Sequence, residues 1–281
     1  MSTLLRTDAV TKAFGGVQAL NGATLEVEEG SIAGLIGPNG SGKTTLFNVI
    51  TGYETVDGGD VYLGDRKMTD ASPDKVFLAG IGRTFQLTRV FSRLTVMENM
   101  IVAAQHAEKG SRRIRNPLAR AGGPATRRRA MELLEFTGIV GHAGALAETL
   151  SYGQRKLLEL SYVLMADPAI VLLDEPAGGV NPSLIRHIAA RIRDLNDQGK
   201  TFLIVEHNME FVMGLCHQVT VLDYGTVVAS GPPEIISTDP RVLDAYLGAP
   251  LDDPADAAAE TAHRAGGSTA AGASTADGAG D

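Results

Sequence analysis

One stretch constrains the fold of this chain more than any other: Gly37, Pro38, Asn39, Gly40, Ser41, Gly42, Lys43 and Thr44. It has the spacing G-x-x-x-x-G-K-[ST] of a phosphate-binding loop. The apolar residues 32–36 predict a buried strand before it, and Thr45 with the residues up to 50 predicts a helix after it. Glycines let backbone N–H groups turn toward phosphate oxygens, and the helix start adds positive potential. A chance glycine-rich turn, in a chain with 33 glycines, would not need this strand–loop–helix order.

A nucleotide that is hydrolysed in such a loop needs a metal cation, a carboxylate that binds this cation, and a base that takes a proton from the attacking water. We expect Lys43 to reach the β- and γ-phosphates and the Thr44 hydroxyl to hold Mg²⁺. Asp174 follows the apolar run 170–173, and ligands bind at the carboxyl ends of strands in open α/β sheets. We therefore predict Asp174 as a Mg²⁺ ligand acting through water, and Glu175 as the base. The alternative is a polar strand end without chemistry.

Three further side chains are candidates because of their positions. His207 follows the apolar run 201–205 and would reach the same sheet edge, where it could hydrogen-bond a γ-phosphate. Gln86 ends a predicted strand before a helical insert, where it could contact Mg²⁺ or the attacking water. Phe14 lies upstream of the loop, and could either stack on adenine or fill the core at a strand end.

Strand and helix patterns alternate around the loop, with β-rich flanks and a mostly helical insert at about residues 88–165. This order predicts an α/β fold with a mainly parallel sheet at its centre. Helix starts are indicated by Thr95 with Glu98 three residues later, by Ser151 and by Asn181. We expect one domain over residues 1–249. Residues 250–281 are mostly Ala, Gly, Ser, Thr and Asp, and predict a disordered tail.

Composition excludes some classes of protein. The net charge of −8 and the pI of about 5.3 argue against overall attraction to nucleic acid, so we predict no nucleic-acid partner. The single cysteine, Cys216, excludes an intrachain disulfide and fits a reducing compartment. No stretch approaches the length needed to span a bilayer, so the sequence predicts a cytoplasmic chain.

Arginines cluster in one part of the helical insert, between residues 109 and 129. They are interrupted by Pro and Gly, which predicts an irregular loop leading into a basic helix start. The cluster is either a solvated face or an interaction surface for a partner or for anionic lipid headgroups. Its members are Arg112, Arg113, Arg115, Arg120, Arg127, Arg128 and Arg129.

The run Leu150-Ser151-Tyr152-Gly153-Gln154 resembles the signature motif LSGGQ of ATP-binding cassette (ABC) ATPases, with Tyr152 in place of the first glycine. It follows the phosphate loop and precedes Asp174-Glu175-Pro176 and His207 in the family's order, and these motifs span about residues 4–248. The resemblance implies a P-loop NTPase (RecA-like) core with an antiparallel β subdomain and a helical signature-motif subdomain. It implies ATP and Mg²⁺ as ligands.

The family resemblance also implies how such a chain works. Two cassettes pack head to tail, and Ser151, Gly153 and Gln154 of one complete the nucleotide site of the other. Glu175 would be the general base, His207 the switch and Phe14 the adenine-stacking aromatic. Residues 178–181 occupy the D-loop position, where many members carry an acidic residue and this chain has Asn181.

Residues 83–91 and 94–99, the arginine-rich insert and the ending at 239–248 resemble the longer ATPase of bacterial high-affinity branched-chain amino acid importers. This implies a second ABC ATPase subunit (identical or different), two transmembrane permease subunits and an external solute-binding protein. It places the chain peripherally on the cytoplasmic face of the inner membrane.

Other functions share the cassette chemistry. Urea and amide importers share much of the narrower pattern, so the transported solute stays open. A lipid or lipopolysaccharide exporter would have the same site, and only residues 83–99 and the insert argue against it. Soluble ABC ATPases of DNA repair or translation carry long coiled coils or two cassettes, whereas this sequence has one phosphate loop and no sustained heptads.

Overall fold

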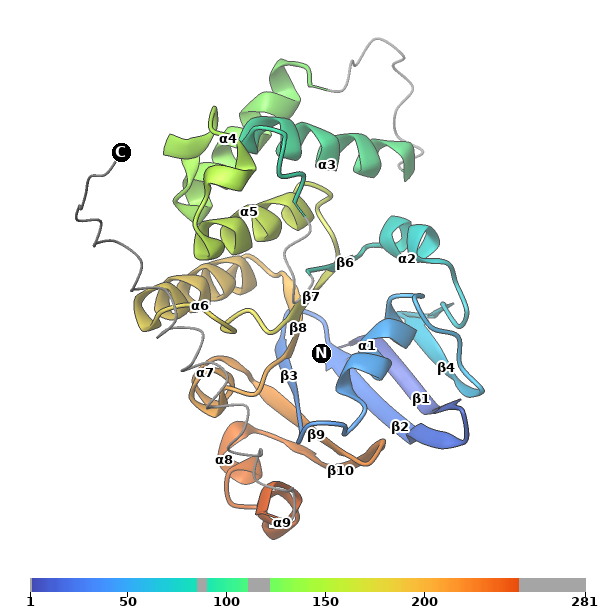
Figure 1. The fold of residues 1–281 in the computed structure, drawn as a ribbon. Helices are drawn as coiled ribbons and strands as arrows, with labels where there is room; N and C mark the ends of the chain where they lie inside the picture. The colour runs from blue at the N-terminus through green and yellow to red at the C-terminus, as the bar shows by residue number, and fades with distance from the viewer. Residues whose placement is uncertain (1, 85–89, 111–121, 248–281) are drawn as a thin grey trace, which may run out of the picture. The chain divides into compact units, whose positions relative to one another are not determined.

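Two β-sheets organise the described part of the chain, which comprises residues 2–84, 90–110 and 122–247 of the computed structural model (Figure 1). The strands are β1 (Thr3–Phe14), β2 (Val17–Glu28), β3 (Ile32–Ile36), β4 (Gly58–Leu63), β5 (Arg66–Lys67), β6 (Ile81–Arg83), β7 (Ile170–Asp174), β8 (Thr201–Val205), β9 (Gln218–Asp223) and β10 (Thr226–Gly231). The helices are α1 (Lys43–Ile50), α2 (Pro73–Ala79), α3 (Val96–Gly110), α4 (Pro124–Thr137), α5 (Tyr152–Leu164), α6 (Pro182–Asp197), α7 (Met209–Leu215), α8 (Pro233–Ile236) and α9 (Pro240–Leu247), with 3-10 turns η1 (Val140–His142) and η2 (Ala147–Thr149).

The larger sheet has the strand order β10-β9-β3-β8-β7-β6, and all its strands except β10 run parallel. β3, β7 and β8 are buried along their whole length, which explains their uninterrupted apolar sequences. Val205 pairs with both Leu35 and Asp174, so the carboxyl ends of these three strands meet at one edge. The predicted α/β fold with a mainly parallel central sheet is confirmed.

The smaller sheet is antiparallel throughout, with the order β2-β1-β4-β5. Helix α1 lies between the two sheets and buries Phe47 completely. Phe47 belongs to one hydrophobic cluster with Leu5 of the smaller sheet and Leu203 of the larger sheet. The smaller sheet therefore holds the helix that follows the phosphate loop, and it corresponds to the expected antiparallel β subdomain.

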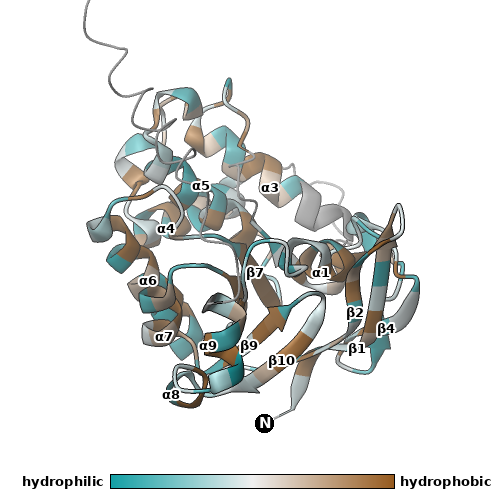
Figure 2. Ribbon diagram, turned by 60° about the horizontal axis from the view of Figure 1, so that its bottom comes forward, coloured by the Kyte–Doolittle hydropathy of each residue, from teal (hydrophilic) through white to brown (hydrophobic). Residues whose placement is uncertain are grey.

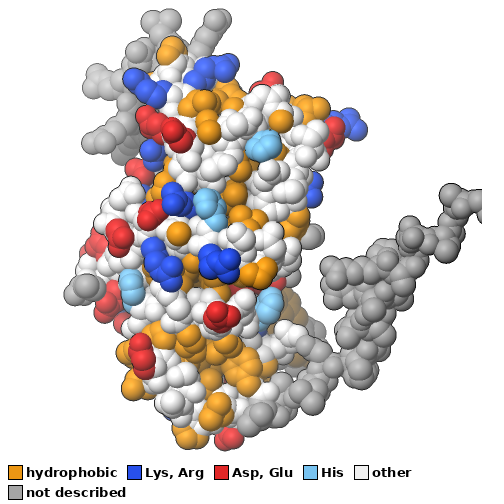
Figure 3. Space-filling view, turned by 90° about the vertical axis from the view of Figure 1, so that its left-hand side faces the viewer, with side chains coloured by type: hydrophobic (Ala, Val, Ile, Leu, Met, Phe, Trp, Pro, Cys, Tyr) orange, Lys and Arg blue, Asp and Glu red, His pale blue; other side chains and the backbone are white. Residues whose placement is uncertain are grey.

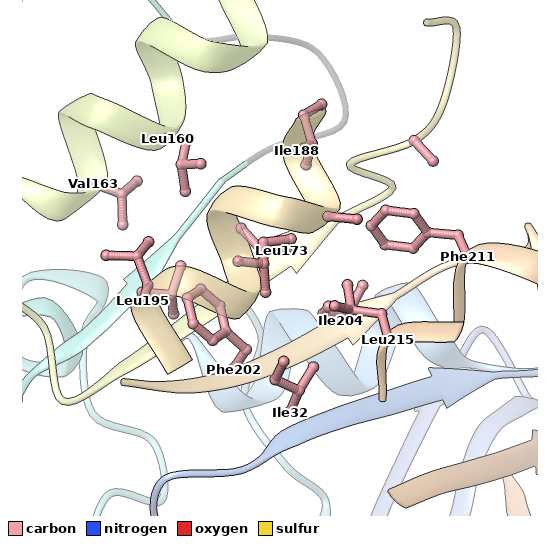
Figure 4. Close-up of a cluster of buried hydrophobic side chains, with 14 of the residues drawn as sticks. Ile32, Leu160, Val163, Leu173, Ile188, Leu195, Phe202, Ile204, Phe211 and Leu215 are labelled. Carbon is pink, nitrogen blue, oxygen red and sulfur yellow. The ribbon is translucent and has the colours of Figure 1, made fainter. Parts of the chain in front are cut away.

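Helices α6 and α7 cover the other face of the larger sheet. The buried side chains that meet there are Ile188 and Leu195 of α6, Phe211 and Leu215 of α7, and Leu173, Phe202 and Ile204 of the sheet (Figure 4). Burying a side chain of this size contributes about 1.5–3 kcal/mol. The apolar residues of α6 recur at helical spacing, which leaves its polar residues outside (Figure 2).

Helices α3, α4 and α5 pack against one another and form the expected helical subdomain. The sequence places its helix starts correctly. The Thr95 hydroxyl accepts from the Glu98 N–H at 3.2 Å, and the Glu98 carboxylate accepts from the Thr95 N–H at 2.7 Å. Because this capping box satisfies two backbone donors, α3 begins where the pattern predicts.

The structure also contains two short helices that the sequence analysis does not predict. These helices are α7 and α8. Cys216, which follows α7, is a small buried residue, and burial raises the pKa of its thiol to about 12. The predicted tail 250–281 lies outside the described residues. No described helix is long and apolar enough to cross a membrane.

One surface of the molecule shows how charges and apolar side chains are distributed. Arg127, Arg128 and Arg129 of α4 are exposed, whereas the other arginines of the cluster lie outside the described residues. Charges of both signs are interspersed on the face in Figure 3, and hydrophobic side chains gather over α7 and α8. Ile235 of α8 is 60% exposed.

Candidate nucleotide-binding site

The phosphate-binding loop connects β3 to α1, as the sequence predicts. Gly42 stands at the N-cap of α1 with φ 102°, and no described side chain caps this helix. Helices α5 and α6, in contrast, are capped by the side chains of Ser151 and Asn181. The first N–H groups of α1 are therefore left for a ligand, and a helix N-terminus with free N–H groups binds anions such as phosphate.

Two glycines of this loop have no room for a side chain. A Cβ on Gly37, which has φ 150°, would lie 2.0 Å from the carbonyl oxygen of Leu222. A Cβ on Gly42 would lie 2.4 Å from the carbonyl oxygen of Ala19. Because both obstacles are backbone atoms, the loop can approach its neighbours this closely only with glycine.

We expect Gly37→Ala to abolish nucleotide binding, because the new methyl group would push the loop away from the backbone of Leu222. Gly40→Ala is the matched control. Gly40 also has a positive φ, of 76°, but nothing lies within 4 Å of its added Cβ. Equilibrium binding of a fluorescent ATP analogue measures both variants. Binding by Gly37→Ala at the wild-type affinity would show that the close approach at Gly37 is not needed.

Lys43 reaches back across the loop. Its Nζ donates to the carbonyl oxygens of Gly37 and Pro38, each at 2.8 Å. Burial lowers the pKa of Lys43, and the negative charge of Glu175 acts in the opposite direction. The ammonium group thus stands over the concave side of the loop, where it could exchange a carbonyl partner for a phosphate oxygen. Thr44, next in the helix, is exposed.

Asp174 is held at the end of β7 by a buried arginine. Arg83 of β6 donates from Nη2 to Asp174 Oδ2 at 2.9 Å, and the two side chains are 8% and 10% exposed. Nη1 of Arg83 donates to Asn48 Oδ1 and Thr51 Oγ1 of the α1 region, each at 2.8 Å. The Asp174 N–H also donates to the side-chain oxygen Oγ1 of Thr84 at 3.3 Å. Arg83 therefore ties the strand before Gln86, the predicted metal ligand and the phosphate-loop helix to one another.

Glu175 and His207 lie together at the same edge. His207 Nδ1 is 3.8 Å from Glu175 Oε1, and the His207 side chain is 65% exposed. Glu175 has φ 47°, a left-handed conformation that is costly for a residue with a side chain. Its N–H donates to Val205 O at 2.9 Å, and its carbonyl oxygen accepts from Lys156 Nζ. Strained backbone of this kind is typical of functional sites.

The signature residues form the start of α5. The Ser151 hydroxyl accepts from the Gln154 N–H at 3.2 Å, and Gln154 Oε1 accepts from the Ser151 N–H at 2.9 Å. Gln154 Nε2 also lies 2.9 Å from His142 Nε2. A Cβ on Gly153 would lie 2.0 Å from Leu184 Cδ2 of α6, so a side chain there would need Leu184 to move. The predicted contribution of these residues to a partner's site stays a prediction.

Of the two remaining candidate residues, Phe14 and Gln86, the structure describes only Phe14. Phe14 is 45% exposed, and Lys12 Nζ lies 5.3 Å from its ring centroid. It is therefore an accessible ring and not a core side chain. Gln86 lies outside the described residues, so its predicted contacts stay predictions.

The sequence did not identify three charged residues that hold the site. Arg83 stands out only as a member of the motif at residues 83–91, and the sequence assigns no role to Glu206 or Lys156. Lys156 is 9% exposed, and burial lowers its pKa while Glu206 and neighbouring carboxylates oppose the shift. The sequence signal that could have found two of them is position: Arg83 ends a short strand three residues before Gln86, and Glu206 follows a buried strand and directly precedes His207.

The fold and this edge define a P-loop nucleotide-binding cassette. The family described as ABC transporter matches residues 20–178, and the family described as branched-chain amino acid ATP-binding cassette transporter matches residues 226–252. The chain therefore belongs to the ABC transporter family, and it is an ATPase whose hydrolysis is coupled to transport.

Individual relatives agree with the family. The chain is 38% identical over 249 residues to the high-affinity branched-chain amino acid transport ATP-binding protein LivG of Escherichia coli (strain K12), covering 87% of this chain and 98% of LivG. The ADP conformation of the cassette MJ1267 is 33% identical with a TM-score of 0.78, covering 89% of this chain and 100% of that one. A dimeric post-hydrolysis state of the cassette MJ0796, bound to ADP and Pi, is 26% identical with a TM-score of 0.71, covering 82% of this chain and 99% of that one.

Proposed function

We propose that this chain is the ATP-hydrolysing subunit of an importer for branched-chain amino acids or related small polar solutes. The observation that carries the proposal is the match of residues 226–252 to the branched-chain amino acid family. The phosphate loop and strand ends serve every ABC ATPase, whereas this segment, which contains β10, α8 and α9, belongs to the narrower family. The 98% coverage of LivG supports the same proposal.

In the proposed site, residues of this chain divide the work. Lys43 and the free N–H groups of α1 bind the phosphates. Thr44, Asp174 and Gln86 hold Mg²⁺, which when bound neutralises charge on the phosphate oxygens. Mg²⁺ is bound by one or two carboxylates together with substrate phosphates and water. The described residues fit this, because Asp174 stands at the sheet edge where β3 leads into the phosphate loop, and Thr44 at the start of α1 is exposed.

Two residues that follow β7 and β8, Glu175 and His207, carry out hydrolysis. Glu175 takes a proton from the attacking water, and His207 donates a hydrogen bond to the γ-phosphate. Their 3.8 Å separation allows both to face one phosphate. The exposure of His207, at 65% of its side chain, leaves it free to turn toward the nucleotide. Phe14 offers its accessible ring to the adenine base.

The proposed active form contains two cassettes. Ser151, Gly153 and Gln154 of one would cover the nucleotide in the phosphate loop of the other, where the positive potential of the α5 N-terminus favours the phosphates. The second ATPase subunit is identical or different, and two transmembrane permease subunits with an external solute-binding protein complete the importer. The chain would lie peripherally on the cytoplasmic face of the membrane.

Transport by the assembled complex tests this function. The chain is purified with the membrane subunits that accompany it and placed in liposomes with the external binding protein and internal ATP. We expect uptake of radiolabelled leucine, isoleucine or valine, and ATPase activity that rises when the loaded binding protein is present. Stimulation by urea or acetamide alone would instead assign the chain to an amide importer. Co-purification with ribosomes or DNA and not with membranes would contradict transport altogether.

A further inference from the structure

Glu206 is a buried carboxylate that the proposed chemistry does not use. It follows β8 directly, precedes His207, and is 1% exposed. Its Oε1 accepts a hydrogen bond from the N–H of Ala177 at 2.6 Å. Its Oε2 accepts from the N–H groups of His207 and Asn208, at 3.0 and 3.1 Å. A single side chain thus satisfies three backbone donors from two segments of the chain.

These two segments carry the two residues proposed for hydrolysis. Ala177 is two residues after Glu175, and His207 is the proposed switch. We propose that Glu206 is a positioning residue, which holds the Glu175 segment and the His207 segment at a fixed separation and so keeps base and switch on one phosphate. The inference rests on the roles proposed above for Glu175 and His207.

The hydrogen bonds of Glu206 favour a role in holding the two segments together over a role as a second base. Each carboxylate oxygen already accepts at least one hydrogen bond from backbone, the bond to Oε1 being short, and hydrogen bonds to an ionised acceptor are roughly twice as strong as neutral ones. Burying a carboxylate is costly unless it is fully hydrogen-bonded. Three N–H donors meet this requirement, and the nearby Lys156, which donates to the Glu175 carbonyl oxygen, adds a positive charge.

The rest of the Glu175 segment is tied to the same place. The Glu175 N–H is bonded to Val205 O at 2.9 Å, and the Gly178 N–H is bonded to Glu175 O at 3.0 Å. The link through Glu206 therefore closes a ring that runs from β8 through Glu175 and Ala177 back to His207. Residues 178–181 follow directly, so a displacement at His207 would be passed to the D-loop position.

Replacing Glu206 by Gln tests the inference, because the amide keeps the size but has one acceptor oxygen and one NH₂ donor. One of the two segments would then face a donor in place of an acceptor. We expect kcat of the assembled complex to fall by about 10–100-fold, since a misplacement of about 1 Å costs up to 10²-fold. The KM and the Kd for ATP should stay within about twofold of the wild type, because the phosphate loop is untouched.

Amide hydrogen exchange provides a readout that does not depend on activity. In Glu206→Gln the exchange of peptides covering 174–181 and 206–212 should accelerate, while that of the phosphate loop should not. Glu210→Gln is the matched control, since Glu210 is an exposed glutamate of α7. This control should match the wild type in kcat and in exchange.

Three results would overturn the inference. A wild-type kcat in Glu206→Gln would show that the link is not needed. Unchanged exchange in both segments would show that the link does not hold them. A loss of ATP affinity and of thermal stability in parallel with kcat would mean a general structural role. If Glu175→Gln also hydrolyses ATP normally, the proposed base is wrong; if Glu175→Gln is inactive and Glu206→Gln is normal, only this inference fails.

Discussion

Replacing Glu175 by Gln is expected to stop ATP hydrolysis and to leave ATP binding intact. Gln has the shape of Glu but cannot accept a proton from the attacking water, and loss of a general base costs about 10²–10⁴-fold in rate. The backbone of Glu175, at φ 47°, is fixed by its bond to Val205 O and by Lys156, so the substitution leaves the strand end in place. Phosphate release under saturating ATP measures the rate, and equilibrium binding measures the affinity.

A second readout follows from the proposed pairing of two cassettes. If hydrolysis separates them, Glu175→Gln should accumulate as an ATP-bound pair that is seen by size-exclusion chromatography with light scattering. Glu135→Gln, on the exposed face of α4, is the control and should behave as wild type. Hydrolysis by Glu175→Gln at near the wild-type rate would show that another group is the base. Fast turnover by a proven monomer would contradict the pairing.

Replacing Arg83 by Met is expected to have the largest effect on stability. The substitution leaves Asp174 buried without its partner, and removing one member of a buried ion pair costs about 3–5 kcal/mol. It also removes the donor to Asn48 Oδ1 and Thr51 Oγ1, which are part of the α1 region. Urea unfolding in the absence of nucleotide measures the free-energy change. The Mg²⁺ concentration needed for half-maximal ATP binding should rise as well, because Asp174 is no longer oriented.

Two further variants distinguish the stability cost of breaking a buried ion pair from the cost of removing any charged residue. Arg6→Met removes an ion pair with Asp8 whose side chains are 41% and 40% exposed, and it should cost less than about 1 kcal/mol. Asp174→Asn combined with Arg83→Met should recover part of the lost stability, because no unpaired buried charge remains. Equal costs for Arg83→Met and Arg6→Met would show that burial of the Arg83 pair adds nothing.

The parts of the fold that were predicted correctly have sequences whose local pattern agrees with their environment. β3, β7 and β8 are buried on both faces, so their apolar runs identified them and placed Asp174 and His207 at one edge. The capping box at Thr95 and the Asn181 cap marked helix starts in the same way. These signals are local, and a single sequence is sufficient to find them.

The parts that were missed depend on contacts between distant segments. Arg83 pairs with Asp174, 91 residues away, and Glu206 pairs with Ala177, 29 residues away, so their burial has no local signal. Whether Phe14 is exposed was equally open, because it depends on what packs over the strand end. Helix α7 is short, and its local signs are the Asn208 cap and Glu210 in its first turn.

The uncapped start of α1 has a thermodynamic consequence. Four helix N–H groups have no intrahelical partner, and here no described side chain replaces one. An anion that completes these bonds binds the folded state and not the unfolded chain, so at 100 times its Kd it adds about 2.7 kcal/mol to the free energy of unfolding. The resistance of this domain to unfolding is therefore set partly by the nucleotide concentration around it, and a chain depleted of nucleotide is the form most exposed to proteolysis.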